Sequence, residues 1–390
     1  MQSNDQVFDV CVRGGGIVGR ALALALSRQG LAVALQATLR TATLQAPLAT
    51  TTLQAPARVA VNEDVRAYAL NAASVALLES LKVWHELPVD ARTAVFDMRV
   101  QGDAAASVLR FSAWQQQVRE LAWIVDAAAL EAELAAALRY APHVSATTGD
   151  VPARLLVLAE GRASSTREQL GVSFETHDYS QTAIAARLQT DAPHGGLARQ
   201  WFHAPDVLAL LPTDRPQVGH GLALVWSLPA ERAQTLLASG DAEFEAELMK
   251  LTQGEAGALT LASPRASWPL MLARAERVHG PGWVLVGDAA HVVHPLAGQG
   301  LNLGLGDVAA LVQVLAEREP WRDLADPKLL ERYARRRALP VQAMAAMTDG
   351  LLRLFAHPSP WAKELRNRGL GLVEAAAPLK RWLASRALGQ

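Results

Sequence analysis

A scarcity of cysteine is the first feature of this sequence of 390 residues, which contains only Cys11. One cysteine cannot form a disulfide within the chain, and it cannot supply the paired thiolates of a structural zinc site. We therefore expect a chain that folds without disulfides and holds no metal. Cys11 itself stands within a predicted strand, where burial in the core is the common role of a free cysteine.

An excess of charge of one sign is also missing. The 37 Lys and Arg residues nearly balance the 38 Asp and Glu residues, which gives a formal net charge of −1. Such a chain creates no overall field that attracts nucleic acid, so we expect no nucleic-acid partner. Hydrophobic residues make up 51% and charged residues 19% of the chain, and this balance predicts a globular protein with a sizeable core.

Long apolar runs are missing as well. No run approaches the roughly 18 residues that are needed to span a bilayer. The N-terminus lacks a basic segment followed by an apolar one, and its first apolar residues begin a predicted strand at Val7. From these absences we expect a soluble, cytoplasmic protein.

The order of the first elements predicts an α/β fold. Residues 7–12 favour a short buried strand, glycines follow, residues 17–29 favour a helix, and residues 31–35 favour a second strand. This order is typical of a βαβ unit, whose two strands pair in parallel. We therefore predict that the chain begins with a Rossmann-like cofactor-binding domain.

Later segments differ in character. Residues 37–62 are rich in Thr, Ala, Gln and Pro and contain a short tandem duplication, which favours a surface loop. Alternating apolar and polar stretches from about residue 172 are typical of an antiparallel sheet with one buried face. Helices are predicted at 65–81, at 130–138, before residue 315 and after residue 328, and buried strands at 155–158 and 284–286. The predicted division is a discontinuous cofactor-binding domain (1–171 and 272–327), a β-rich substrate domain (172–271) and a helical C-terminal region (328–390).

The first glycine motif runs from Gly14 through Gly16, Ile17 and Val18 to Gly19. It stands directly after the first strand and opens the first helix, as a dinucleotide-binding fingerprint does. Gly14 permits a tight turn, Gly16 lets a pyrophosphate approach the backbone, and Gly19 lets the helix pack closely on the strand. The start of the helix supplies N–H donors and a favourable dipole for the phosphates.

Gln36 stands at the end of the second strand, where such sites usually place Asp or Glu for the ribose hydroxyls. A glutamine oxygen still accepts a hydrogen bond, although less strongly than a carboxylate does. Gln36 is therefore either a weaker ribose ligand or an uninvolved strand end.

The second glycine motif indicates a flavin dinucleotide. Gly287 and Asp288 end a predicted strand, where a carboxylate can accept hydrogen bonds from a polyol chain. Another glycine-rich segment then opens a helix, whose backbone N–H groups would stabilise an anionic reduced flavin. NAD has no ribityl chain and needs no second site of this kind. The candidate cofactor ligands of this motif are Gly287, Asp288, Pro295, Gly298, Gln299, Gly300, Leu301 and Asn302.

Residues 284–307 resemble the signature of the ubiquinone-biosynthesis hydroxylase family. That family belongs to the para-hydroxybenzoate-hydroxylase-like, single-component flavin monooxygenases. The string from His294 and Pro295 to Asn302 is its specific part. Supporting segments extend the resemblance over nearly the whole chain: residues 65–71, 200–202, 208–212, 225–226 and 378–380.

The resemblance implies FAD, a transient NAD(P)H electron donor, and insertion of one atom of O2 into an aromatic ring, often that of a polyprenylated phenol. It places Asp288 at the ribityl chain, residues 298–302 beside the isoalloxazine ring, and Arg66 near flavin and substrate. Arg66, His294 and Pro295 are thus candidates beside the flavin, and no catalytic base is assigned. The single Gly-x-Gly-x-x-Gly motif leaves no second Rossmann unit for NAD(P)H.

One further position departs from the family's pattern. Glu160-Gly161 stands where the family has Asp-Gly, beside a strand that helps to cradle the cofactor. The extra methylene group of Glu160 would move its carboxylate within a site that requires exact placement. Together with Gln36 it predicts weaker binding of FAD, and the alternative is that Glu160 lies on a surface turn. His291 and His294 either tune protons near the flavin or hydrogen-bond their own loop.

The C-terminal residues 353–390 contain seven Lys or Arg against two Asp or Glu, a balance of +5. A basic amphipathic helix of this kind suits contact with the inner membrane face, and the alternative is a solvated helix packed on the core. Three functions stay open: a hydroxylase of an isoprenoid-tailed phenol in ubiquinone biosynthesis, a hydroxylase of a small soluble aromatic compound, and a cofactor-weakened flavoprotein that serves as a scaffold in a biosynthetic complex.

Overall fold

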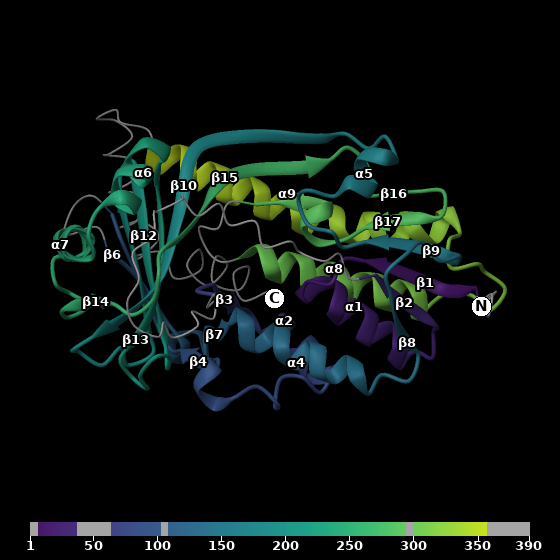
Figure 1. The fold of residues 1–390 in the computed structure, drawn as a ribbon, viewed down its shortest axis with the longest axis horizontal. Coiled ribbons are helices and arrows are strands. Elements are labelled where there is room, and N and C mark those ends of the chain that lie inside the picture. The colour runs from purple at the N-terminus through teal and green to yellow at the C-terminus, as the bar shows by residue number, and fades with distance from the viewer. Residues whose placement is uncertain (1–6, 37–63, 103–107, 294–298, 357–390) are drawn as a thin grey trace, which may run out of the picture.

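The computed structural model describes residues 7–36, 64–102, 108–293 and 299–356 (Figure 1). In this part of the chain a six-stranded sheet, a nine-stranded sheet and a small three-stranded sheet are flanked by helices. The predicted α/β class, a parallel Rossmann-like sheet combined with a β-rich unit, is confirmed. The duplicated residues 43–56, the loop residues 294–298 and the tail 357–390 lie outside the described residues.

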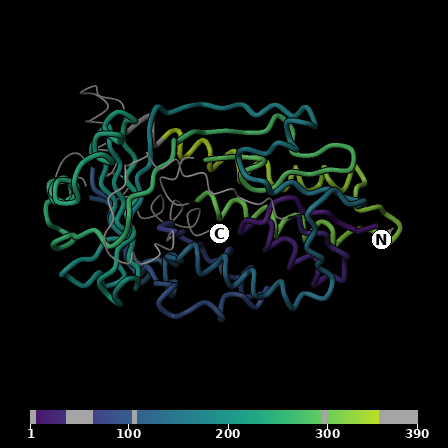
Figure 2. Tube along the Cα trace, viewed as in Figure 1, coloured from purple at the N-terminus to yellow at the C-terminus, as the bar shows by residue number. Residues whose placement is uncertain are grey.

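The six-stranded sheet is built around β1 (Phe8–Arg13). It pairs in parallel with β2 (Val33–Gln36) on one side and with β9 (Ala153–Leu158) on the other. The sheet is completed by β8 (Val144–Thr147) and β17 (Trp283–Leu285), which are parallel to their neighbours, and by β16 (His279–Gly280), which is antiparallel. Figure 2 shows the chain leaving this sheet and returning to it late in the sequence.

The predicted βαβ unit is present. Helix α1 (Ile17–Arg28) joins β1 to β2, and Gly30 follows it with a φ of +78°, the left-handed conformation that favours glycine after a helix. The second strand begins two residues later than predicted because Leu31 still belongs to the closing turn: its N–H donates to the Leu26 carbonyl.

Helix α8 (Gln299–Ala316) packs in the core of this unit against α1, α2 (Ala72–Ser80) and α9 (Pro327–Ala356). A Cβ added to Gly304 would lie 2.7 Å from Cγ2 of Val18, so glycine allows α8 to approach α1 closely. By length and composition α8 could cross a membrane, but more than half of that stretch is buried inside the fold. It is therefore a core helix.

The nine-stranded sheet forms the other end of the molecule (Figure 1). Most of its strands are antiparallel, and β5, from the earlier part of the chain, pairs in parallel with β11. The large sheet thus includes a segment from within residues 1–171. Its strands are β5 (Asp97–Gln101), β6 (Val108–Ser112), β10 (Phe174–Thr190), β11 (Leu197–His203), β12 (Asp206–Thr213), β13 (Gly221–Pro229), β14 (Leu259–Leu261), β15 (Ala266–Ala275) and β18 (His291–Val292).

One face of the large sheet is covered by α6 (Ala230–Ala238) and α7 (Asp241–Thr252). Trp226 and Phe244 are fully buried there and pack at 5.7 Å between ring centroids. Successive side chains of a strand point to opposite faces of a sheet. The residues that alternate with Trp226 and the other core residues along each strand therefore point to the opposite face, which we call the inner face. The inner face is the one that meets the first unit, since β12 contacts two strands of the small sheet.

The small sheet corrects one prediction. Residues 65–81, predicted as one helix, form strand β3 (Ala67–Leu70) and then helix α2. The side chain of Asn71 caps α2 by accepting a hydrogen bond from the N–H of Ser74 at 2.9 Å, and β3 pairs with a distant strand.

The other elements are β4 (Arg92–Val95), β7 (Ala122–Asp126), α3 (Ala113–Gln116), α4 (Ala127–Arg139), α5 (Ser165–Gln169), and the 3-10 turns η1 (Val89–Ala91) and η2 (Gly287–Ala289).

Candidate functional site

The first glycine motif forms a tight turn between β1 and α1. Gly14 has a φ of +121°, and its N–H donates to the Gln36 carbonyl at 2.9 Å. A Cβ at Gly14 would overlap the Ala159 carbonyl, and a Cβ at Gly19 would overlap the carbonyl of Gly14. A Cβ at Gly16 would meet nothing within 4 Å. Two glycines therefore serve the packing of the turn, whereas Gly16 leaves open space at the start of the helix.

That open space has the properties of a phosphate site. The first turn of α1 contains no acidic residue, and Gly16, at the N-cap, offers no side chain to cap the helix. The free N–H groups and the helix dipole are then available to an anion. Ile17 is buried, and Val18 packs against Gly287 and Gly304, so these two residues of the motif act through packing.

Gln36 ends β2 beside this turn. Its side-chain oxygen Oε1 is buried and has no hydrogen-bond partner among the described residues. A buried acceptor without a donor is costly, and a ribose hydroxyl would supply the missing donor. Gln36 thus fits the role of ribose ligand better than that of an uninvolved strand end.

Glu160 lies just after β9, and its carboxylate is already engaged by protein groups. It accepts hydrogen bonds from the hydroxyl groups of Ser164 at 2.5 Å and Thr166 at 2.9 Å, at the start of α5. Thr166 in turn accepts a hydrogen bond from Arg13 at 3.1 Å. Gly161 follows with a φ of +79°. The longer side chain of Glu160 is therefore matched to a local cap, which was not foreseen from the sequence.

Asp288 lies on η2, the turn that follows β17. Its side chain is accessible to solvent, yet the surrounding protein desolvates it and raises the pKa of its carboxyl above the ordinary value. Positive charge at His291, Arg162 and Arg66 opposes this effect. Asp288 is thus an accessible carboxylate that is partly desolvated by the surrounding protein, and the hydroxyl groups of a polyol could donate hydrogen bonds to it.

Asp307 holds this turn in place, and its role was missed in the sequence. It is fully buried on α8; its Oδ2 accepts from the Gly287 N–H at 2.8 Å and lies 2.7 Å from Nε2 of His291. Its Oδ1 accepts from Arg337 of α9 at 2.6 Å. His291 therefore serves its own loop, as one of the two alternatives proposed. The only sequence signal for Asp307 is a carboxylate in an otherwise apolar helix.

Burial alone would raise the pKa of the Asp307 carboxyl. The charges and hydrogen bonds of His291, Arg337 and the Gly287 N–H outweigh burial and hold the pKa below its ordinary value of 3.8. The carboxylate is therefore ionised in the folded protein, and its partners stabilise the charge.

The predicted ligands at the start of α8 fall into two groups. The side chain of Asn302 is fully engaged: its Nδ2 donates to the Ala69 carbonyl at 2.8 Å and to Gln299 at 3.2 Å, and its Oδ1 accepts from Asn71 and Ser74. Leu301 is buried, and Gly300 faces open space. This end of α8 can therefore offer backbone N–H groups rather than side chains. His294, Pro295 and Gly298 lie outside the described residues.

Arg66 directly precedes β3, the strand that Asn302 ties to the start of α8. Its guanidinium group donates to Asp64 at 2.5 Å, to Tyr68 at 3.0 Å and to Glu131 at 3.2 Å. The desolvated Tyr68 hydroxyl, whose pKa is raised mainly by burial, also lies within electrostatic reach of Asp288. The charge of Arg66 also acts on Asp288, where it opposes the effect of desolvation on the pKa.

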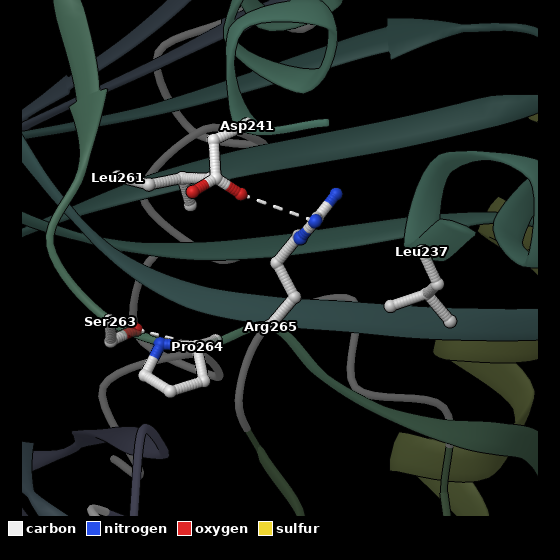
Figure 3. Close-up of a pocket in the computed structure, with 6 residues that line it drawn as sticks. All are labelled: Leu237, Asp241, Leu261, Ser263, Pro264 and Arg265. Atoms are coloured by element: carbon white, nitrogen blue, oxygen red, sulfur yellow. Dashed lines mark hydrogen bonds and ion pairs between the residues drawn. The ribbon is translucent and has the colours of Figure 1, made fainter. Parts of the chain in front are cut away.

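Further features of the described residues bear on the site. The ring of His203, on β11, hydrogen-bonds the Leu251 carbonyl at 3.2 Å. Among the described residues, no group of three or more His, Cys, Asp or Glu side chains could hold a metal ion. A cavity of ≈ 510 Å³ is lined by residues around Arg265, which is bound to carbonyls at the end of α6 (Figure 3). It contains none of the predicted site residues.

Comparisons with known proteins agree with this geometry. A family model described as an FAD binding domain matches residues 7–348. The ubiquinone hydroxylase UbiL of Rhodospirillum rubrum is 32% identical, over 99% of this chain and 91% of that protein. The 3-demethoxyubiquinol 3-hydroxylase of Escherichia coli is 30% identical over 99% of both chains. The crystal structure of PqsL, a probable FAD-dependent monooxygenase from Pseudomonas aeruginosa, shares the fold with a TM-score of 0.75 at 20% identity, over 94% of this chain and 100% of that one.

Substitutions of Gln36 and Glu160, the two residues that depart from the usual pattern, should have different effects on FAD affinity. Gln36→Glu is expected to tighten FAD binding by about tenfold, because a carboxylate accepts a hydroxyl hydrogen bond more strongly than an amide does. Glu160→Asp is expected to leave FAD affinity no better and to lower the unfolding free energy by about 1 kcal/mol, because it shortens the cap of α5. Fluorescence titration with FAD and urea unfolding measure the two effects. An equal gain in affinity from both substitutions would contradict this assignment.

The Asp307 cluster predicts a pH effect on stability. The folded pKa of Asp307 is depressed, so its contribution is complete above the ordinary value of 3.8 and is lost as the pH falls below it. Asp307→Asn should lower the unfolding free energy at neutral pH by about 3 kcal/mol. The variant should also lose less stability than the wild type between about pH 5 and about pH 3, in urea unfolding at both pH values. Parallel losses in the two proteins would show that the carboxylate is not ionised in the fold.

Proposed function

The chain belongs to the ubiquinone-biosynthesis hydroxylase family of FAD-dependent monooxygenases, and from this premise we propose that it hydroxylates the aromatic ring of a polyprenylated phenol with O2 and NAD(P)H. The single observation that carries the cofactor part is Asp288, an accessible carboxylate in a desolvating site beside a second helix start. Residues 1–171 and 272–327 are proposed as the FAD-binding domain, and 172–271 as the substrate domain.

The described residues fit FAD at both ends. We propose that Gly16 and the start of α1 hold the phosphates, that Gln36 holds the adenosine ribose, and that Asp288 holds the ribityl hydroxyls. Backbone N–H groups from Gln299 to Leu301 would lie beside the flavin ring. When bound, FAD supplies the redox chemistry by which electrons from NAD(P)H activate O2.

The protein's own contribution is to orient the reactants and to exclude water. Arg66, fixed by Asp64 and Glu131, places a constant positive charge beside Asp288. A cation held in this way stabilises negative charge near the cofactor without any proton transfer from the protein. His294 and Pro295 remain proposed neighbours of the flavin. No residue is proposed as a catalytic base, since a phenol ring is already activated for attack at carbon.

The inner face of the large sheet supports an apolar substrate. Most of the alternating positions in the middle of β10, β12 and β13 carry small or apolar residues, namely Ala183, Ala185, Ala209, Leu211, Ala223 and Val225, and the uncharged polar residues Gln181 and Ser227 lie on the same face. Arg187 is the charged residue on this face of these three strands, and its Nη2 is already bound to Asp126 and to the Arg66 carbonyl. A small aromatic acid would require a cation without a counterion, whereas the charge of Arg187 is already paired with Asp126. This face therefore favours a polyprenylated phenol over the small soluble aromatic compound.

We also propose that the protein is cytoplasmic and contacts the inner membrane face through the basic residues 353–390, where an isoprenoid-tailed substrate would be found. Membership of a biosynthetic complex is compatible with such a contact. The scaffold alternative is less well supported, because Gln36 and Glu160 each have a consistent structural role.

Substitution of Asp288 tests the proposed function. The wild type should bind FAD and become yellow, and a polyprenylated phenol should accelerate its NAD(P)H oxidation more than a soluble aromatic acid does. Asp288→Ala should weaken FAD binding by about tenfold or more, because it removes a charged hydrogen-bond acceptor. Asp241→Ala, which removes an exposed carboxylate from the cavity near Arg265, is the matched control and should leave FAD affinity unchanged. Protein that stays colourless with added FAD would overturn the proposal, and stronger stimulation by the soluble acid would favour the second function.

A further inference from the structure

Arg187 forms a buried link between the large sheet and Arg66, the residue that directly precedes β3. It lies on β10 and is 8% exposed. Its Nη2 donates to the backbone carbonyl of Arg66 at 2.8 Å and to Oδ2 of Asp126 at 2.7 Å. One side chain of the large sheet thus contacts both the residue before β3 and the junction between β7 and α4.

The Arg66 carbonyl is a defined point of attachment. It accepts a second hydrogen bond from the N–H of Ala127, the first residue of α4, at 3.1 Å. On the other side of the same residue, the Arg66 guanidinium is held by Asp64, Tyr68 and Glu131. Arg66 directly precedes β3, which Asn302 ties to the start of α8, and the charge of Arg66 reaches Asp288. A shift of the Arg66 backbone would therefore move a charge beside the proposed ribityl ligand.

Stability alone is a poor explanation for Arg187. Its second terminal nitrogen, Nη1, is buried without a hydrogen-bond partner among the described residues, so the guanidinium group is only partly satisfied. Asp126 does not depend on Arg187 for all its contacts, because it caps α4 through the Ala129 N–H and lies 3.7 Å from Arg215. Buried ion pairs often stabilise a fold no better than apolar residues of similar size, and some are kept because they specify geometry.

We propose that Arg187 is a positioning residue for the cofactor site: it holds the backbone of Arg66 so that the guanidinium group of Arg66 faces the flavin end of FAD. The inference rests on the proposed function, because it requires FAD to bind beside Arg66 and Asp288. Through this link the large sheet sets the position of a charge in the cofactor site, although no hydrogen bond joins Arg187 to the described residues of either glycine motif.

The first test compares variants that lose a cation beside a buried aspartate. Arg187→Met should weaken FAD binding by about tenfold, the effect of losing one hydrogen bond that involves a charged group, and should shift the absorption spectrum of the bound flavin. In Arg187→Met the carboxylate of Asp126 loses its buried counterion. Combining Arg187→Met with Asp126→Asn removes that charge, and the asparagine still serves as an N-cap for α4. The double variant should bind FAD as weakly as Arg187→Met does. The matched control is Arg232→Met, which removes the partner of buried Asp206 in the same sheet and should leave FAD affinity and spectrum unchanged.

A double-mutant cycle tests the route through Arg66. If Arg187 acts by positioning Arg66, Arg187→Met should have no further effect on FAD affinity in an Arg66→Met background. Two results would overturn the inference in a wild type that binds FAD. One is that the losses of affinity from the two substitutions add. The other is that Arg187→Met, alone and combined with Asp126→Asn, keeps the FAD affinity and the flavin spectrum of the wild type. A wild type that fails to bind FAD would instead overturn the proposed function on which the inference rests.

Discussion

The buried carboxylate of Asp307 is the interaction on which the rest of the site depends. It joins the Gly287 turn and the ring of His291, which follow β17, to Arg337 of α9, which is far from them in the sequence. Without its acceptor atoms the Gly287 N–H would be buried and unpaired, and Arg337 would lose its counterion. Since Asp288 follows Gly287 directly, the direction in which its carboxylate points is set by this cluster.

Close packing also fixes the first glycine motif relative to the turn that bears Asp288. Val18 of α1 fits against Gly287 and Gly304, so the start of α1 and the turn that bears Asp288 are held at a fixed separation. Asn302 ties the start of α8 to β3 and to the start of α2 with three hydrogen bonds. The phosphate end and the polyol end of the proposed FAD site are thus parts of one packed unit, which is what a cofactor that spans both requires.

Much of this arrangement could be predicted because its signals are local. The strand, glycine turn and helix between Phe8 and Arg28 depend on neighbouring residues, and so does the glycine-rich start of α8. The strand β3 could not be predicted within the helix expected at 65–81, because it forms by pairing with the distant strand β7. The start of α2 is set by the Asn71 cap. The entry of β5 into the large sheet is likewise a non-local pairing.

The site residues show the same division. Gly14 and Gly19 pack in the tight turn that their spacing predicts, whereas the hydrogen bonds of Glu160 to Ser164 and Thr166 at the start of α5 were not predicted. Its partners Ser164 and Thr166 lie close in sequence, but nothing in their identity shows that they bind Glu160. Asp307 and Arg187 act through contacts with residues more than one element away. Such contacts need the fold before they can be seen.

The measurement that tests the central claim most directly is the origin of the oxygen in the product. The FAD-loaded protein would be incubated with NAD(P)H, a polyprenylated phenol and heavy-isotope O2, and the product analysed by mass spectrometry. The account predicts one heavy oxygen atom in a new hydroxyl group on the ring. A hydroxyl group whose oxygen comes from water, or NAD(P)H oxidation with no hydroxylated product, would contradict it.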